Sequence, residues 1–116
     1  MKFLFILNDP AYGTERSYNG LRLAISLAKR DGVEMRVFLM ADAIACGKSN
    51  QKTPQGYYNL ERMVKLLTGL DVPVGSCTTC MDARGMEDAH LASGVHRSSL
   101  DELTDWSVWA DKIVVF

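Results

Sequence analysis

The stretch Phe3-Leu4-Phe5-Ile6-Leu7 decides the fold, because an uninterrupted apolar run of this length is typical of a strand buried on both faces of a sheet. Pro10 and Gly13 follow it and predict a turn. We then expect a helix with Thr14 as its N-cap and Gly32 just beyond its end. The apolar residues between them recur at the spacing of one helix face: Leu21, Ala24, Ile25 and Ala28.

Strands and helices continue to alternate along the rest of the chain. Apolar runs predict further buried strands at residues 35–41, 72–76 and 113–116, and a short strand is also expected at residues 95–97. Pro73 indicates that the strand it lies in begins there or is an edge strand. Helical spacing predicts one helix from Leu60 to about Gly69. It predicts a last helix whose core face carries Leu100, Leu103 and Trp106.

This alternation predicts an α/β fold, specifically a three-layer α/β/α sandwich around a mainly parallel sheet of about five strands. Residues 1–116 are expected to form a single domain, since a chain of 116 residues suits one hydrophobic core. Sites in such sheets lie beyond the C-terminal ends of the strands. That rule selects residues 8–13, 42–46 and 77–85 as candidate site regions.

Composition excludes several classes of function. Thirteen Lys and Arg face fourteen Asp and Glu, for a net charge of −1, so we expect no nucleic-acid partner and no anionic membrane surface. No apolar stretch approaches the roughly 20 residues of a membrane span. We therefore expect a cytoplasmic protein, in which the three cysteines are free thiols.

Cys77 is the strongest candidate for a reactive group, because it directly follows the third predicted strand. A thiolate there is favoured by backbone N–H groups, by a helix N-terminus or by a cation such as Arg84. Cys80 completes a C-x-x-C motif, whose spacing permits a disulfide and also occurs in zinc sites. The two histidines do not have the spacing of a zinc finger, so no metal site is predicted. The alternative for Cys77 is a buried structural cysteine.

The other strand ends supply candidate substrate-binding residues. Tyr12, Gly13 and Thr14 link a strand to a helix N-terminus, a place that can bind anions, although a simple tight turn is the alternative. Asp42 follows the second strand at the same predicted edge of the sheet. The turn lacks the glycines of a dinucleotide- or phosphate-binding loop, and no cofactor is expected.

Two motifs together resemble the DsrE/DsrF-like family: Asp9-Pro10-Ala11-Tyr12-Gly13-Thr14 after the first strand, and Cys77-Thr78-Thr79-Cys80-Met81-Asp82-Ala83-Arg84-Gly85 after the third. Stretches 21–25, 37–43, 56–57 and 110–112 also match, in the same order. The resemblance covers essentially the whole chain and is greatest to the YchN-like branch, whose members are small homo-oligomeric proteins of bacteria and archaea.

The resemblance implies a role in sulfur relay. In the related TusD/DsrE sulfur-transfer subunits, a cysteine after the third strand carries a persulfide, and that position matches Cys77. Arg84 and Gly85 match the Arg-Gly that follows it, which makes Arg84 a candidate stabiliser of the thiolate. Cys80 has no counterpart in those subunits but is shared with the YchN-like branch. The resemblance also implies a homotrimer or a homohexamer of two stacked trimers.

Three functions remain open at this point. The first is transfer of sulfane sulfur between donor and acceptor proteins through a persulfide on Cys77. The second is thiol-disulfide redox chemistry or sensing, in which Cys77 and Cys80 cycle together. The third is a non-enzymatic binding module in which the oligomer is the functional unit and the cysteines are incidental.

Overall fold

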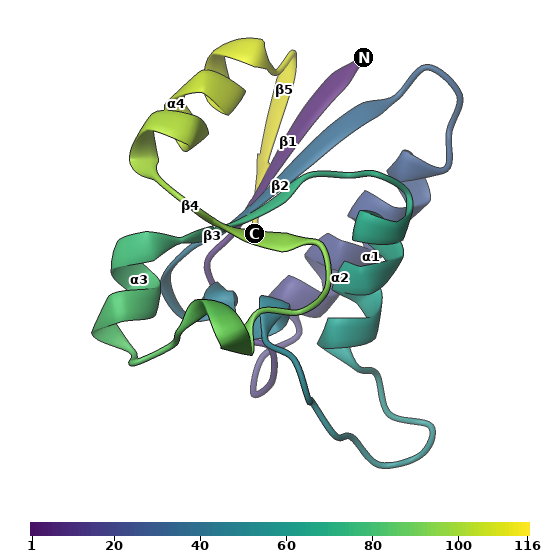
Figure 1. The fold of residues 1–116 in the computed structure, drawn as a ribbon. Coiled ribbons are helices and arrows are strands. Elements are labelled where there is room, and N and C mark those ends of the chain that lie inside the picture. Colours follow the sequence, from purple (N-terminus) through teal and green to yellow (C-terminus); the bar gives the residue numbers. More distant parts are fainter.

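The structure is a computed structural model that describes residues 1–116, with a five-stranded sheet at its centre (Figure 1). The strands lie in the order β4-β3-β2-β1-β5, and every neighbouring pair is parallel. The predicted α/β fold and its mainly parallel sheet of about five strands are therefore confirmed. The strand bounds are β1 (Lys2–Leu7), β2 (Glu34–Leu39), β3 (Val74–Cys77), β4 (Val95–Ser98) and β5 (Lys112–Val115).

Helices lie on both faces of the sheet, as a three-layer sandwich requires (Figure 1). α1 and α2 pack side by side on one face, and α4 covers part of the other. None of the helices combines the length and the apolar character needed to cross a membrane. The α-helices are α1 (Arg16–Ala28), α2 (Leu60–Gly69), α3 (Thr78–Ala83) and α4 (Leu100–Trp109), and two short 3₁₀ segments are η1 (Ala41–Gly47) and η2 (Asp88–His90).

The two-residue period of a strand divides the core between the two faces. Phe5 and Leu7 of β1 belong to a cluster of 17 buried residues on the side of α1 and α2. Leu4 belongs to a smaller cluster with Phe38 and with Trp106 of α4. Both sets are fully or nearly fully buried, which explains why the run at residues 3–7 is apolar without interruption.

Some boundaries differ from the prediction, among them the end of β2, which is Leu39 rather than residue 41. The sequence predicts Thr14 as the N-cap of α1, but the helix begins at Arg16 and its N-cap is Glu15. The Thr14 hydroxyl instead donates a hydrogen bond to Asp9 at 3.2 Å. Strand β3 begins just after Pro73, in agreement with the first of the two alternatives for that proline, and it is not an edge strand, because β2 and β4 pair with it on either side.

The last strand and the last helix are less buried than predicted. β5 is an edge strand, so only alternate side chains reach the core, and Ile113 and Val115 are 48% and 60% exposed. Leu103 and Trp106 of α4 are buried as expected. The prediction that Leu100 lies on the core face is wrong, because its side chain is 74% exposed in the first turn of α4.

Because all five strands are parallel, their C-terminal ends meet at one edge of the sheet. Cys77 ends β3, and Ser98 ends the neighbouring strand β4, with which Cys77 is paired in register. Met40 follows β2 on the other side of β3. The Cys77 thiol, the start of α3 and the start of η1 therefore lie together at this edge of the sheet.

Candidate functional site

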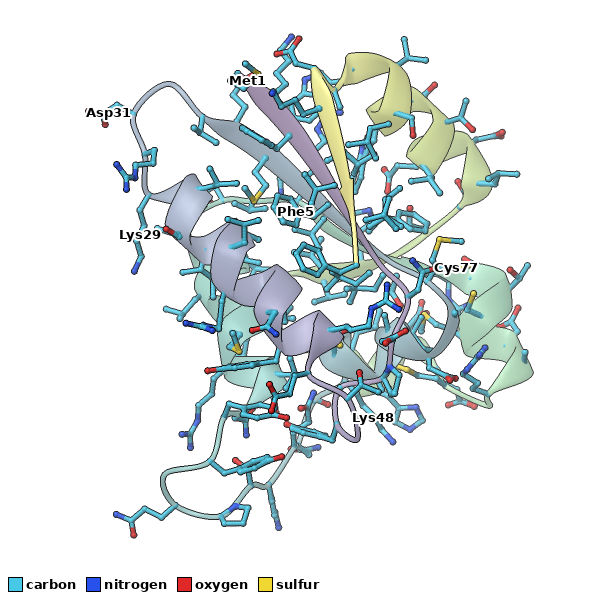
Figure 2. The ribbon with its side chains drawn as sticks, turned by 180° about the vertical axis from the view of Figure 1, so that it is seen from behind. Met1, Phe5, Lys29, Asp31, Lys48 and Cys77 are labelled. Carbon is cyan, nitrogen blue, oxygen red and sulfur yellow. The ribbon has the colours of Figure 1, made fainter.

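Cys77 lies at the junction between the sheet and a helix, as Figure 2 shows. It is both the last residue of β3 and the N-cap residue of α3, with the extended backbone that an N-cap requires. The chain therefore passes directly from strand to helix, and the side chain is left half-buried at the rim. The sequence predicts that Cys77 directly follows the third strand; in the structure it is the last residue of that strand, which is interior to the sheet.

The surroundings of Cys77 favour its thiolate. Partial desolvation acts to raise the pKa of the Cys77 thiol, but hydrogen bonds from the Thr79 hydroxyl and the Cys80 thiol outweigh it, so the pKa is lowered from its ordinary value. The Thr79 Oγ1 lies 3.3 Å from the Cys77 Sγ. Backbone N–H groups of Thr79 and Cys80 also point toward the sulfur, although neither closes a full capping bond.

Cys80 has the opposite character. Desolvation and its hydrogen bond with Cys77 raise the pKa of the Cys80 thiol, while the N–H of Ala41 and the charge of Arg84 partly oppose them. The Ala41 N–H donates to the Cys80 Sγ at 3.1 Å. Ala41 adopts a left-handed backbone with φ of 51°, which is uncommon for a residue other than glycine. The pair thus combines one thiol whose pKa is lowered with one whose pKa is raised.

Arg84 and Asp42 meet in the structure, but beside Cys80 rather than Cys77. The Arg84 Nε donates to Asp42 Oδ1 at 2.9 Å, and its Nη1 donates to the carbonyl of Cys80 at 3.1 Å. Both groups line a hollow of about 240 Å³ with Pro10. A role for Arg84 in stabilising the Cys77 thiolate stays a prediction, because its hydrogen bonds are made to other groups.

A larger cavity opens directly beside Cys77. Its volume is about 500 Å³, within the range of small-molecule sites. The C-x-x-C motif forms one side of it. The rest is formed by Ser99 and by apolar side chains of β2, of the residue after β2 and of α4. None of its lining residues is charged: they are Phe38, Met40, Cys77, Thr78, Thr79, Cys80, Ser99, Leu100 and Leu103.

The turn after β1 is not part of this cavity. Tyr12, Gly13 and Thr14, predicted as substrate-binding residues, do not line it. The Tyr12 hydroxyl donates to Gln51 at 2.6 Å and accepts from Leu60 N at 3.1 Å, so it fixes the loop before α2. This loop, residues 48–59, contributes no residue to the cavity either.

The remaining titratable candidates lie away from the cavity. Cys46 is fully buried, and desolvation raises the pKa of its thiol to about 12, against a weaker opposing bond with Ser17. Such a thiol is inert in the native protein. No group of three or more His, Cys, Asp or Glu side chains is arranged to hold a metal ion.

Sequence reasoning missed several contributors to the site. Thr79 lies inside the quoted motif, and its position two residues after Cys77 at a helix start is a signal that was available. No sequence pattern indicates the hydrogen bond from the Ala41 N–H to Cys80, because the two residues are 39 positions apart in the chain. The apolar cavity wall was also missed, since Phe38 and Leu103 read only as core residues.

Comparisons with known proteins agree with this architecture. The DsrE/DsrF-like family profile matches residues 1–116. Protein YchN of Escherichia coli K12 is 40% identical over 99% of this chain and 98% of its own, and its crystal structure superposes with a TM-score of 0.93. An uncharacterized protein of Methanocaldococcus jannaschii, MJ0989, is 30% identical over the full length of both chains.

A more distant relative carries a functional name. The sulfurtransferase TusD homolog of Haemophilus influenzae is 23% identical over 98% of both chains. The match of the family profile to every residue, together with the identity to YchN, confirms the resemblance inferred from the two motifs. The chain belongs to the DsrE/DsrF-like family.

Proposed function

We propose that this protein accepts sulfane sulfur on Cys77 as a persulfide and passes it to an acceptor thiol. The observation that carries the proposal is the thiol itself: its pKa is lowered, it lies at the strand tip, and it faces an open cavity. The thiolate is the nucleophile in sulfur exchange, so a lowered pKa increases the reactive fraction at neutral pH. The distant relative named as a TusD sulfurtransferase homolog supports the same chemistry.

The reaction is a pair of thiolate displacements at sulfur. In loading, the Cys77 thiolate attacks the terminal sulfur of a donor persulfide, a new S–S bond forms, and the donor leaves as its thiolate. In unloading, an acceptor thiolate attacks the terminal sulfur of the Cys77 persulfide, and Cys77 leaves as a thiolate. The hydrogen bonds from Thr79 and Cys80 stabilise that leaving group, because they favour the charged sulfur.

Mass spectrometry of the intact protein tests the loading step. We expect the reduced protein to gain the mass of one sulfur atom after incubation with a persulfide donor, and to lose it on reduction. Cys77→Ser should abolish the gain. Cys46→Ala is the matched control, because that thiol is fully buried and should contribute nothing. Loading that persists in Cys77→Ser would contradict the proposal.

A second candidate function is a redox cycle of Cys77 and Cys80, favoured by the hydrogen bond between their thiols. The Cys80 thiolate would attack the inner sulfur of a Cys77 persulfide, form a Cys77–Cys80 disulfide and release hydrosulfide. In this case the protein loses two hydrogens, gains no sulfur, and depends equally on both cysteines. Loading that is unaffected by Cys80→Ser excludes this candidate.

We also propose that the protein works as a homotrimer or homohexamer in the cytoplasm, together with sulfur-donor and sulfur-acceptor proteins. Apolar side chains exposed on the edge strand β5, Ile113 and Val115, support self-association. Sedimentation equilibrium measures the assembly directly, and a monomer at micromolar concentration would contradict it. In that case the third hypothesis, a binding module whose functional unit is the oligomer, would also fail.

A further inference from the structure

The charge distribution around Cys77 bears on which sulfur compounds can reach it. The cavity beside the thiol has no charged side chain among its nine lining residues. The nearest cationic group along the chain, Arg84, is paired with Asp42 and lines the other hollow. Arg97, on the neighbouring strand β4, is paired with Asp82 and Asp88. No cationic side chain lines the cavity, so an anionic ligand held in it would gain no ion pair from the lining.

The lining of the cavity combines polar and apolar groups. Thr78, Thr79 and Ser99 carry hydroxyl groups, and that of Thr79 lies 3.3 Å from the Cys77 sulfur. Phe38 and Leu103 supply apolar surface. Transfer of apolar surface into such a pocket is favourable, whereas transfer of an unpaired charge is strongly unfavourable. Small-molecule sites commonly combine apolar walls with a few polar groups that orient the ligand.

We infer that the low-mass sulfur carrier that reacts with Cys77 is a persulfide whose substituent R is an uncharged, apolar alkyl or aryl group, held in the cavity formed by β2, α4 and the C-x-x-C motif. This inference rests on the proposed function and names its substrate class. The Cys77 thiolate attacks the terminal sulfur of R–S–SH, Cys77–S–SH forms, and R–S⁻ departs while its apolar R group lies against Phe38, Met40 and Leu103. Carriers with further negative charge, such as thiosulfate or glutathione persulfide with its charged R group, are disfavoured.

A pair of alkylating probes tests the cavity without requiring sulfur transfer. N-phenylmaleimide and its para-carboxyl derivative share the same electrophile and ring but differ by one negative charge. Their rates at Cys77, followed by peptide mapping and normalised to N-acetylcysteine, should favour the neutral probe by about tenfold or more. Equal normalised rates, or a preference for the anion, would overturn the inference. So would protection of Cys77 from both probes in the native protein, since a second copy would then cover the cavity.

A charged substitution at the mouth gives a directional check. Leu100→Arg adds a cation to the cavity lining at a position that is 74% exposed, so the fold should tolerate it. It should reduce the preference for the neutral probe by about fivefold. Val108→Arg is the matched control, because Val108 is 84% exposed on the same helix but does not line the cavity. Equal effects of the two substitutions would overturn the inference.

Sulfur donors separate this inference from the function on which it rests. Benzyl persulfide should load Cys77 faster than glutathione persulfide after each is normalised to its reaction with N-acetylcysteine. If neither donor loads Cys77 while the maleimide preference holds, the proposed function fails but the chemistry of the cavity stands. If both donors load at equal normalised rates, the proposed function survives and the inferred substrate class is wrong.

Discussion

Replacing Thr79 by valine should make Cys77 a weaker nucleophile at neutral pH. Valine keeps the shape of threonine but removes the hydroxyl that lies 3.3 Å from the Cys77 sulfur. Thr79 is exposed, so the substitution should leave the fold intact. Loss of this bond raises the pKa of the Cys77 thiol, because the bond stabilises the charged form.

The size of the effect follows from the strength and exposure of the bond. A hydrogen bond to a charged group contributes about 1.5–3 kcal/mol. Water competes at this half-exposed position, so we take about 1 kcal/mol, which is about fivefold in the thiolate fraction below the pKa. The pH–rate profile of Cys77 alkylation by iodoacetamide, resolved by peptide mapping, measures it. The profile should move toward higher pH in Thr79→Val, and the rates should converge at alkaline pH.

Thr79→Ser is the matched control, because it retains a hydroxyl at the same position and should preserve most of the reactivity. Two results would refute the reasoning. One is a profile for Thr79→Val that coincides with that of the unmodified protein. The other is a shift in Thr79→Ser as large as that in Thr79→Val, which would indicate a change in local structure rather than loss of a hydrogen bond.

Further predictions concern Cys46 and two glycines. Burial raises the pKa of Cys46 to about 12 from an ordinary value of 9.0, so the unfolded chain releases this proton first and stability falls between these pH values. Denaturant titrations should show a smaller alkaline loss in Cys46→Ala, and an equal loss would contradict the assignment. Gly94→Ala should destabilise the fold by about 2–5 kcal/mol through strain and overlap, because its φ is +86° and a Cβ would lie 2.6 Å from Thr68. Gly85→Ala, at φ +65° in open space, should cost only about 1 kcal/mol, and equal losses would refute this reading.

Much of the fold could be predicted because local and tertiary signals agree. The apolar run at residues 3–7 is buried on both faces of β1, and α2 covers the residues 60–69 that its periodicity indicates. The family resemblance and the strand-end rule both selected Cys77, which the structure places at the tip of β3. These features depend on neighbours that are close in sequence or on a general property of parallel sheets.

Other features depend on contacts that no local pattern encodes. The contact between Ala41 N–H and Cys80 requires a left-handed alanine and a neighbour 39 positions away. α3 has six residues, which is too few to show a helical period in the sequence. Ile113 and Val115 are exposed because β5 lies at the edge of the sheet. The sequence could not show this, since an apolar run has the same pattern in an edge strand and in a central one.

Tracing isotopically labelled sulfane sulfur through the protein tests the central claim most directly. The label would be supplied on a donor persulfide, followed on the Cys77 peptide, and then followed into an acceptor thiol added after the donor is removed. The account predicts that the label appears on Cys77 and then on the acceptor as a persulfide, and that Cys77→Ser carries none. Release of all the label as free sulfide with a Cys77–Cys80 disulfide left behind, or label that never reaches Cys77, would contradict it.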